Sequence, residues 1–129
     1  MPIPAEFHPR YFTLDERDGV TVVAFTSSHL TDEENIEQLG HEMFALVEQF
    51  NCRRVVVSLA PVEFLTSSVL GKLITLHRRL HRQNGRLAIC DIRPPVADVL
   101  HTSRLISYFS TCLDVDSAVA MLNEPGSPG

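Results

Sequence analysis

The sequence predicts an α/β fold, in which a single domain holds a mixed β-sheet with amphipathic helices in the order β-β-α-β-α-β-α-β-α. Three observations predict it. Asp18-Gly19 is a strong turn signal between two strand-like segments, and two long segments repeat apolar residues at helical spacing. Apolar runs without alternation, such as residues 55–57, are typical of strands covered on both faces. The chain has 129 residues, of which 44 % are hydrophobic, and this suffices for one domain with a core.

The first two strands form a predicted hairpin over residues 11–26. Apolar and polar side chains alternate over residues 12–15, Asp18-Gly19 makes the turn, and residues 20–25 continue as a second strand. A helix follows, because apolar residues recur at helical spacing from Ile36 to Phe50. Thr31 is the expected N-cap, Glu34 completes a capping box, and Asn51 is the expected stop.

The remaining elements alternate between strands and helices. Residues 54–58 and 86–90 predict buried strands, and residues 67–83 predict a helix between them that ends at Asn84-Gly85. Together they make a parallel βαβ unit with a right-handed crossover. Residues 93–105 predict a short helix with proline in its first turn, residues 108–115 a last strand, and residues 116–123 a last helix. We expect a surface segment over residues 1–10, the domain over 11–122 and a flexible tail over 123–129.

Composition and charge argue against several classes of function. The net charge of −5 argues against binding to nucleic acid or to an anionic membrane. No apolar run reaches the length of a membrane span, and the first residues lack a signal-peptide pattern, so we expect a cytoplasmic protein. The three cysteines, Cys52, Cys90 and Cys112, are widely spaced and fit reduced thiols, with Cys90 as a core residue.

No enzyme motif is present. The sequence has neither phosphate-binding glycine-loop motif and no G-x-S-x-G elbow, and no set of acid, base and nucleophile converges. Ser58 stands where a receiver domain would need an acid at the end of its central strand. We therefore expect no catalytic residues and no cofactor. His77 and His81 have the spacing to share a metal, but no acidic or thiol ligand stands beside them, so we expect no metal site.

The second helix and its exit are basic. The cations are Lys72, Arg78, Arg79, Arg82 and Arg86. A solvated outer face explains them most simply, and a contact surface for an acidic partner is the alternative.

Three hydroxyl residues, Thr66, Ser67 and Ser68, open the second helix. Thr66 or Ser67 is the expected N-cap. A phosphate at this position would meet free backbone N–H groups and the positive end of the helix dipole, so the domain would tolerate it. Helical spacing places Ser68 on an outer line with Lys72, Thr75 and Arg79, and by itself favours Ser68 as the exposed hydroxyl.

Residues 55–73, VVVSLAPVEFLTSSVLGKL, resemble the signature of the anti-sigma-factor antagonists, whose domain is called STAS. That signature is an apolar strand and a turn, then an aspartate, two serines, a glycine, a leucine and a glycine that open a helix. The matching positions are Phe64, Leu65, Ser67, Ser68, Leu70 and Gly71. Residues 85–105 also match, through Gly85, Cys90, Pro94 and Leu105. The resemblance extends from about residue 12 to residue 122 and implies a STAS-like domain.

The resemblance implies a regulatory function. Family members bind an anti-sigma factor, usually also an ATP-dependent serine kinase, and thereby release a sigma factor for transcription. The kinase phosphorylates the first serine of the pair, which blocks binding, and a serine phosphatase reverses this. Carried onto this chain, the acceptor is Ser67, with Ser68 as second choice and Thr66 as third. The implied partner-binding residues are Thr66, Ser68, Val69, Lys72, Thr75, Ser28 and His29.

Two other hypotheses stay open. Thr66 and Val69 stand where the family has aspartate and glycine, which motivates an unphosphorylated STAS scaffold or accessory subunit of a stress-sensing or transport complex. A ligand-binding module or enzyme ranks lower, and a polar pocket lined by His29, His77 or His101 would favour it. The sequence leaves a homodimer possible.

Overall fold

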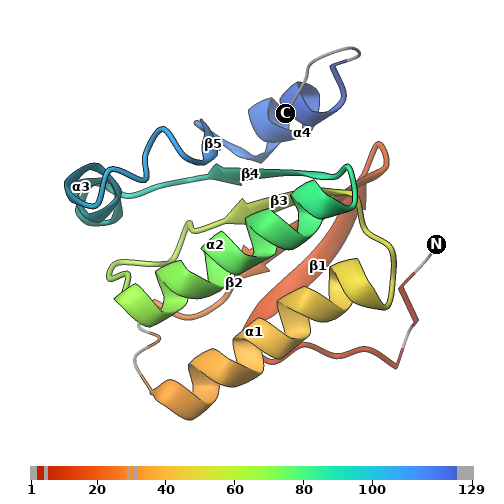
Figure 1. The fold of residues 1–129 in the computed structure, drawn as a ribbon, viewed down its shortest axis with the longest axis horizontal. Helices are drawn as coiled ribbons and strands as arrows, with labels where there is room; N and C mark the ends of the chain where they lie inside the picture. Colours follow the sequence, from red (N-terminus) through yellow and green to blue (C-terminus); the bar gives the residue numbers. More distant parts are fainter. Residues whose placement is uncertain (1–2, 5, 29, 31, 125–129) are drawn as a thin grey trace.

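In a computed structural model, which describes residues 3–4, 6–28, 30 and 32–124, five strands form one mixed sheet in the order β1-β2-β3-β4-β5 (Figure 1). The strands are β1 (Phe12–Arg17), β2 (Val20–Phe25), β3 (Arg54–Ser58), β4 (Arg86–Cys90) and β5 (Ser110–Cys112). The helices are α1 (Glu33–Glu48), α2 (Ser67–Arg82), α3 (Pro94–Thr102) and α4 (Val115–Leu122). This order confirms the predicted fold class.

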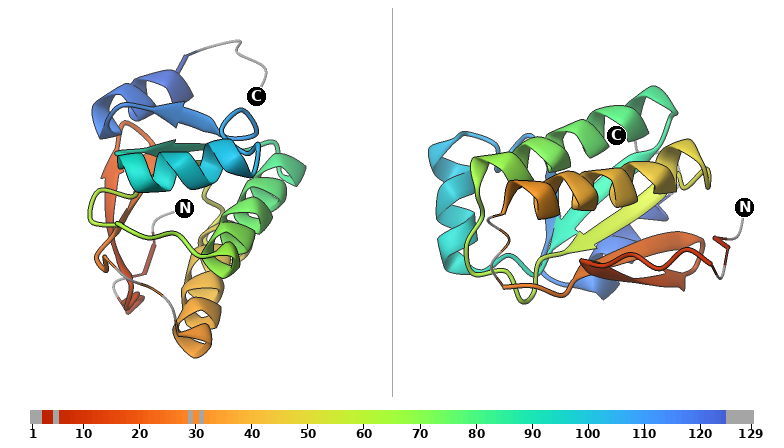
Figure 2. Two further views of the ribbon diagram at one scale, coloured as in Figure 1. Left: turned by 90° about the vertical axis from the view of Figure 1, so that its left-hand side faces the viewer. Right: turned by 90° about the horizontal axis from the view of Figure 1, so that it is seen from below.

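The sheet is covered on both faces. Strands β2 to β5 run parallel, and β1 pairs with β2 in the antiparallel sense. Helices α1 and α2 lie side by side on one face, and α4 packs on the other (Figure 2). The side chains of β3 alternate between the two cores, with Val55 and Val57 facing α1 and α2 and Val56 facing α4. A strand buried on both faces needs apolar residues at every position, which explains the unbroken valine run.

The hairpin turn confirms the Asp18-Gly19 prediction. Both residues adopt positive φ, 52° at Asp18 and 80° at Gly19. This is the conformation that a two-residue type I′ hairpin requires, and its twist matches that of the strands.

Helix α1 is capped one residue later than predicted. Asp32 is the N-cap, and its Oδ1 accepts a hydrogen bond from the Glu34 N–H at 2.9 Å. Thr31, the predicted cap, lies outside the described residues. The predicted stop at Asn51 is confirmed, because Asn51 adopts a φ of 56° just beyond the helix.

Two residues with different roles form the turn after α2. Asn84, rather than Gly85, takes the left-handed conformation, with a φ of 61°. Gly85 is needed for space, since a Cβ there would lie 2.6 Å from the carbonyl oxygen of Arg53 and 3.1 Å from that of Leu80. A glycine was correctly predicted at this helix end. It is required because two backbone carbonyl groups approach Gly85 too closely for a side chain.

The segment before β1 is held against α1. The Arg10 N–H donates to both carboxylate oxygens of Glu42, at 3.1 and 3.0 Å, and the Glu42 side chain is buried. The Phe7 ring meets Phe50 edge-on, with centroids 5.0 Å apart. Of the predicted flexible tail, residues 125–129 lie outside the described residues. The domain boundaries therefore remain a prediction.

We predict that Gly85→Ala destabilises the domain by about 1–3 kcal/mol, because its Cβ would press on backbone atoms that cannot move independently. Gly71→Ala is the matched control. A Cβ at Gly71 meets nothing within 4 Å, so alanine in this helical position should stabilise by up to about 1 kcal/mol. Urea unfolding of both variants measures the difference. Equal stability of the two would contradict the packing assigned to Gly85.

Candidate functional site

The hydroxyl triplet opens α2 at the edge of the sheet where the parallel strands end. Thr66 is the N-cap, with φ −80° and ψ 160°, and its Oγ1 accepts a hydrogen bond from the Val69 N–H at 3.2 Å. The choice between Thr66 and Ser67 as the cap is thereby resolved. Ser67 is the first helical residue, and the first turn of α2 carries no acidic side chain.

Ser67 is exposed, whereas Ser68 is half-buried. This corrects the preference for Ser68 as the exposed hydroxyl that came from helical spacing alone. Val69 is 3 % exposed and belongs to the core. Its side chain offers no surface to a partner, which corrects its inclusion among the partner-binding residues.

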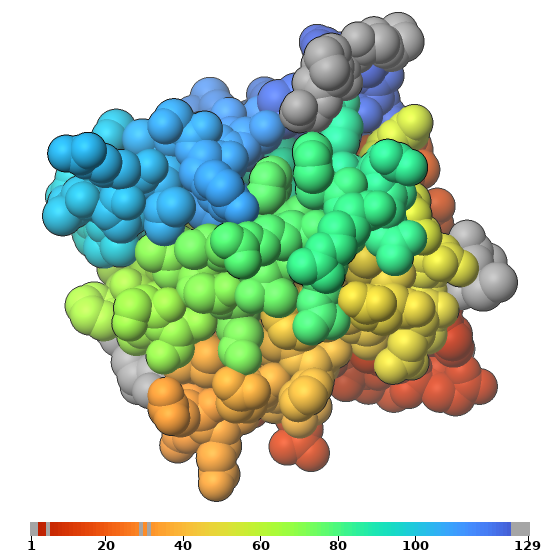
Figure 3. Space-filling model, in the orientation of Figure 1, coloured from red at the N-terminus to blue at the C-terminus, as the bar shows by residue number. Residues whose placement is uncertain are grey.

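The predicted outer line of α2 faces α1 instead of solvent. Its four residues, Ser68, Lys72, Thr75 and Arg79, are all half-buried. In the space-filling view α2 in green and α1 in orange and yellow abut along their length (Figure 3). The Arg79 guanidinium pairs with Glu48 at 3.0 Å and lies 4.3 Å from the centroid of the Phe44 ring. Helical spacing alone predicts one covered face for α2, whereas the sheet and α1 cover two of its faces, so the prediction of an outer line was wrong.

Lys72 connects the two helices. Its Nζ lies 2.7 Å from the Glu37 Oε1, and the hydrogen bond and charge of Lys72 lower the pKa of the Glu37 carboxyl. The lysine stem crosses α1 at Gly40, where an added Cβ would lie 2.8 Å from the Lys72 Cδ. Gly40 therefore permits the close helix contact that positions Lys72.

A shallow hollow lies beside the triplet, between the N-terminal halves of α1 and α2. Its volume is about 310 Å³, and it is lined by Glu33, Ile36, Glu37, Ser67, Ser68, Gly71, Lys72 and Thr75. The sequence-predicted residues Ser67, Ser68, Lys72 and Thr75 therefore share one site. The carboxylates of Glu33 and Glu37 on α1 were not predicted to lie here, because only the pairing of the two helices brings them to this site.

The surface around the triplet has two further features. Phe64, two residues before the N-cap, is an exposed aromatic side chain at 56 % exposure. Gly71 is exposed, one turn after Ser67. Both were noted in the sequence only as matches to a family signature. The Glu63 N–H donates to the Ser28 carbonyl at 3.2 Å, which brings the loop before α1 to the same surface. His29, predicted to contribute, lies outside the described residues.

Cys90 is a buried core residue, as predicted. Burial, followed by the neighbouring Asp91 carboxylate, raises the pKa of its thiol to about 12, so the thiolate is disfavoured. Cys52, Cys90 and Cys112 are all free thiols.

His77 and His81 stack at the other end of α2, with ring centroids 6.2 Å apart and planes at 19°. Among the residues that the structure describes, no group of three or more histidine, cysteine, aspartate or glutamate side chains is arranged to hold a metal. Burial, with a smaller contribution from the charge of His81, lowers the pKa of His77.

The chain belongs to the STAS domain family, whose model matches residues 11–118. A candidate anti-sigma factor antagonist of Bordetella bronchiseptica, BtrV, is 28 % identical over 108 residues, covering 84 % of this chain and 90 % of its own. The anti-sigma F factor antagonist of Paenibacillus polymyxa is 26 % identical over 92 residues, which is 71 % of this chain and 77 % of its own.

Solved structures share the fold at low identity. A STAS domain protein from Planctomyces limnophilus has a TM-score of 0.78 at 22 % identity, covering 88 % of this chain and 98 % of its own. SpoIIAA of Bacillus in its phosphorylated form has a TM-score of 0.66 at 18 % identity, with 87 and 99 % covered. A stressosome component also scores 0.66, at 20 % identity, with 85 and 95 % covered.

Among the described helices, none combines the length and apolar character needed to cross a bilayer.

We predict that His77 makes stability depend on pH. Its folded pKa lies below the ordinary 6.5, so the unfolded chain takes up the proton first as the pH falls. The stabilisation is complete above pH 6.5 and is lost as the pH falls through the lowered folded pKa. Unfolding free energies at pH 7.5 and 5.5 should therefore differ more for the wild type than for His77→Gln. His101→Gln, at an exposed position, is the control and should behave as the wild type. An equal pH dependence in all three proteins would refute this assignment.

Proposed function

We propose that this protein is an anti-sigma factor antagonist that binds an anti-sigma factor with serine kinase activity and is switched off by phosphorylation of Ser67. The observation that carries the proposal is the placement of Ser67, exposed at the first position of α2 and lining the hollow between α1 and α2. The two relatives, described as a candidate anti-sigma factor antagonist and an anti-sigma F factor antagonist, support the antagonist part of the proposal.

The binding surface combines apolar, charged and backbone groups. Phe64 supplies an exposed aromatic anchor beside the triplet. Gly71 leaves the α2 backbone open to a partner, because no side chain stands over it. The Lys72–Glu37 ion pair lines the hollow together with Gly71. The anti-sigma factor would therefore contact the loop before α2 and the seam between the two helices.

Phosphorylation would change this surface without unfolding it. The partner kinase would transfer the γ-phosphoryl group of ATP to the Ser67 Oγ, which loses its proton, and ADP would leave. The product adds about −1.5 to −2 charges next to free N–H groups of the helix start, where the dipole favours an anion. The added charge would lie in a hollow that already holds Glu33 and Glu37 and would compete with Glu37 for Lys72. A serine phosphatase would restore the hydroxyl by hydrolysis.

A second function, an unphosphorylated STAS scaffold in a larger assembly, is favoured by the fold shared with a stressosome component. Thr66 caps α2 without the acidic side chain that the family usually places beside the acceptor. The two functions share a binding surface and differ in whether Ser67 is modified.

We predict that Ser67→Asp weakens binding to the cognate anti-sigma factor by about tenfold or more, because a permanent charge occupies the contact surface. Ser117→Asp is the matched control, since Ser117 is an exposed serine in the first turn of α4 on the opposite face of the sheet. Titration calorimetry on both variants measures the effect. Unchanged affinity in Ser67→Asp would refute the switch.

Incubation of the wild type with that kinase and ATP separates the two functions. A mass gain of one phosphate on the peptide containing residues 66–68, abolished in Ser67→Ala, supports the antagonist. Binding without any mass gain supports the scaffold.

We also predict that Gly71→Ala weakens binding while leaving the fold at least as stable. The added methyl group projects into open space in the free protein and would meet a partner backbone in the complex. Affinity and urea unfolding are measured on the same variant. Full affinity in Gly71→Ala would exclude a close backbone approach at this position.

A further inference from the structure

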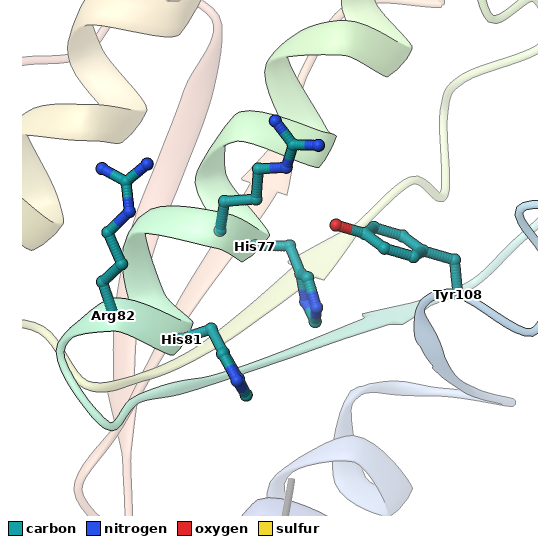
Figure 4. Close-up of a pocket in the computed structure, with 5 residues that line it drawn as sticks. His77, His81, Arg82 and Tyr108 are labelled. Carbon is teal, nitrogen blue, oxygen red and sulfur yellow. The ribbon is translucent and has the colours of Figure 1, made fainter.

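A second hollow, of about 430 Å³, lies at the C-terminal end of α2, away from the hydroxyl triplet. It is lined by His77, Arg78, His81, Arg82 and Tyr108. The two imidazoles project side by side from α2, and the Tyr108 ring faces His77 from the segment before β5 (Figure 4). Ser67 and His77 are ten residues apart, or about 15 Å along the helix axis. This hollow is therefore separate from the surface proposed to bind the anti-sigma factor.

The lining consists of hydrogen-bond donors and cations, without a carboxylate. Among the described residues no aspartate or glutamate forms an ion pair with Arg78 or Arg82. Arg79, the next residue on the same helix, differs because it pairs with Glu48 on α1. Two unpaired guanidinium groups in one hollow on a chain of net charge −5 indicate a local site for an anion.

His77 supplies a second, independent observation. Its Nδ1 is buried and has no hydrogen-bond partner among the described residues. A buried polar atom without a partner is costly, and a turn of the His77 ring toward the hollow would let a ligand atom satisfy it. The Tyr108 ring is 39 % exposed, with its centroid 4.8 Å from that of His77. The hollow therefore offers an aromatic face next to the donors.

The helix dipole offers a simpler explanation for part of this cluster. Basic side chains in the last turn of a helix are favoured by its negative end, and this accounts for His81 and Arg82. The dipole effect falls off within one turn of the helix end. It explains neither the unpaired Arg78 nor the unsatisfied nitrogen of His77, which lie further from that end.

We propose that this hollow binds the phosphate group of a small organic phosphate. The Arg78 guanidinium neutralises the phosphate charge. The His77 ring turns toward the hollow, and its Nδ1–H donates a hydrogen bond to one of the phosphate oxygens. The Tyr108 ring contacts an aromatic part of the ligand, so an aryl phosphate should bind more tightly than inorganic phosphate. This site makes the protein a ligand-binding module in addition to its proposed regulatory function, and it does not depend on that function.

The test is a titration of the ¹⁵N-labelled protein with phenyl phosphate, and separately with inorganic phosphate, followed by backbone amide shifts. We expect saturable shifts in residues 77–82 and 108–109, with tighter binding of phenyl phosphate. Arg78→Gln should weaken this binding about tenfold or more, whereas Arg79→Gln, which removes the same charge from the face toward α1, should change it little. His77→Phe keeps a ring against Tyr108 and should also weaken binding, with the spectrum of the free variant confirming its fold.

Three results would overturn the proposal. No shift at either ligand up to about 10 mM would mean that no such site exists, since that concentration reaches Kd values weaker than 1 mM. If Arg78→Gln and Arg79→Gln weakened phosphate binding equally, the shifts would come from non-specific attraction between the ligand and the basic surface. Equal affinity for phenyl phosphate and inorganic phosphate would exclude the aromatic contact, and with it an organic phosphate as the ligand of this site.

Discussion

The structure depends on the burial of both faces of the central strands. Val55, Val56 and Val57 are fully buried, and Ala88 and Ile89 are buried beside them on β4. A parallel pair with apolar side chains on both faces is stable only when helices cover each face. Helices α1 and α2 therefore share one face, and α4 takes the other. Because β3 and β4 are parallel, the helix that joins them begins near the edge where β3 ends, and this places the hydroxyl triplet there.

The pairing of α1 with α2 makes the candidate site a property of two helices. Gly40 allows the Lys72 stem to lie against α1, and the ammonium group reaches Glu37. The hydroxyl of Ser67 consequently lies in a hollow that holds carboxylates from a different part of the chain. A phosphate on Ser67 would change the charge balance across this seam as well as the shape of the surface. Under the proposed function, this arrangement would link modification of Ser67 to a contact surface contributed by both helices.

The two ends of α2 differ in their chemistry. The N-terminal end combines an N-cap with an exposed hydroxyl, and the C-terminal end combines cations with a half-buried histidine. The cations at the C-terminal end agree with the negative end of the helix dipole, and a phosphate on Ser67 would meet the positive end. Among the described residues, the unpaired Arg78 guanidinium and the unsatisfied His77 nitrogen near the C-terminal end are not explained by the dipole.

The element order, the hairpin turn at Asp18-Gly19 and the capped hydroxyl triplet were predictable from the sequence, because each depends on residues close together in the chain. The resemblance to a family signature was the reason to predict Ser67 rather than Ser68 as the phosphate acceptor. The tertiary structure alone decided which side of α2 is open to solvent, since α1 covers the line through Lys72 and Arg79 that spacing had placed outside. It also decided that Val69 is core, that Glu33 and Glu37 line the hollow beside Ser67, and that Tyr108 faces His77. Local spacing determines which residues share a face of a helix, whereas contacts between residues distant in the chain determine what that face meets.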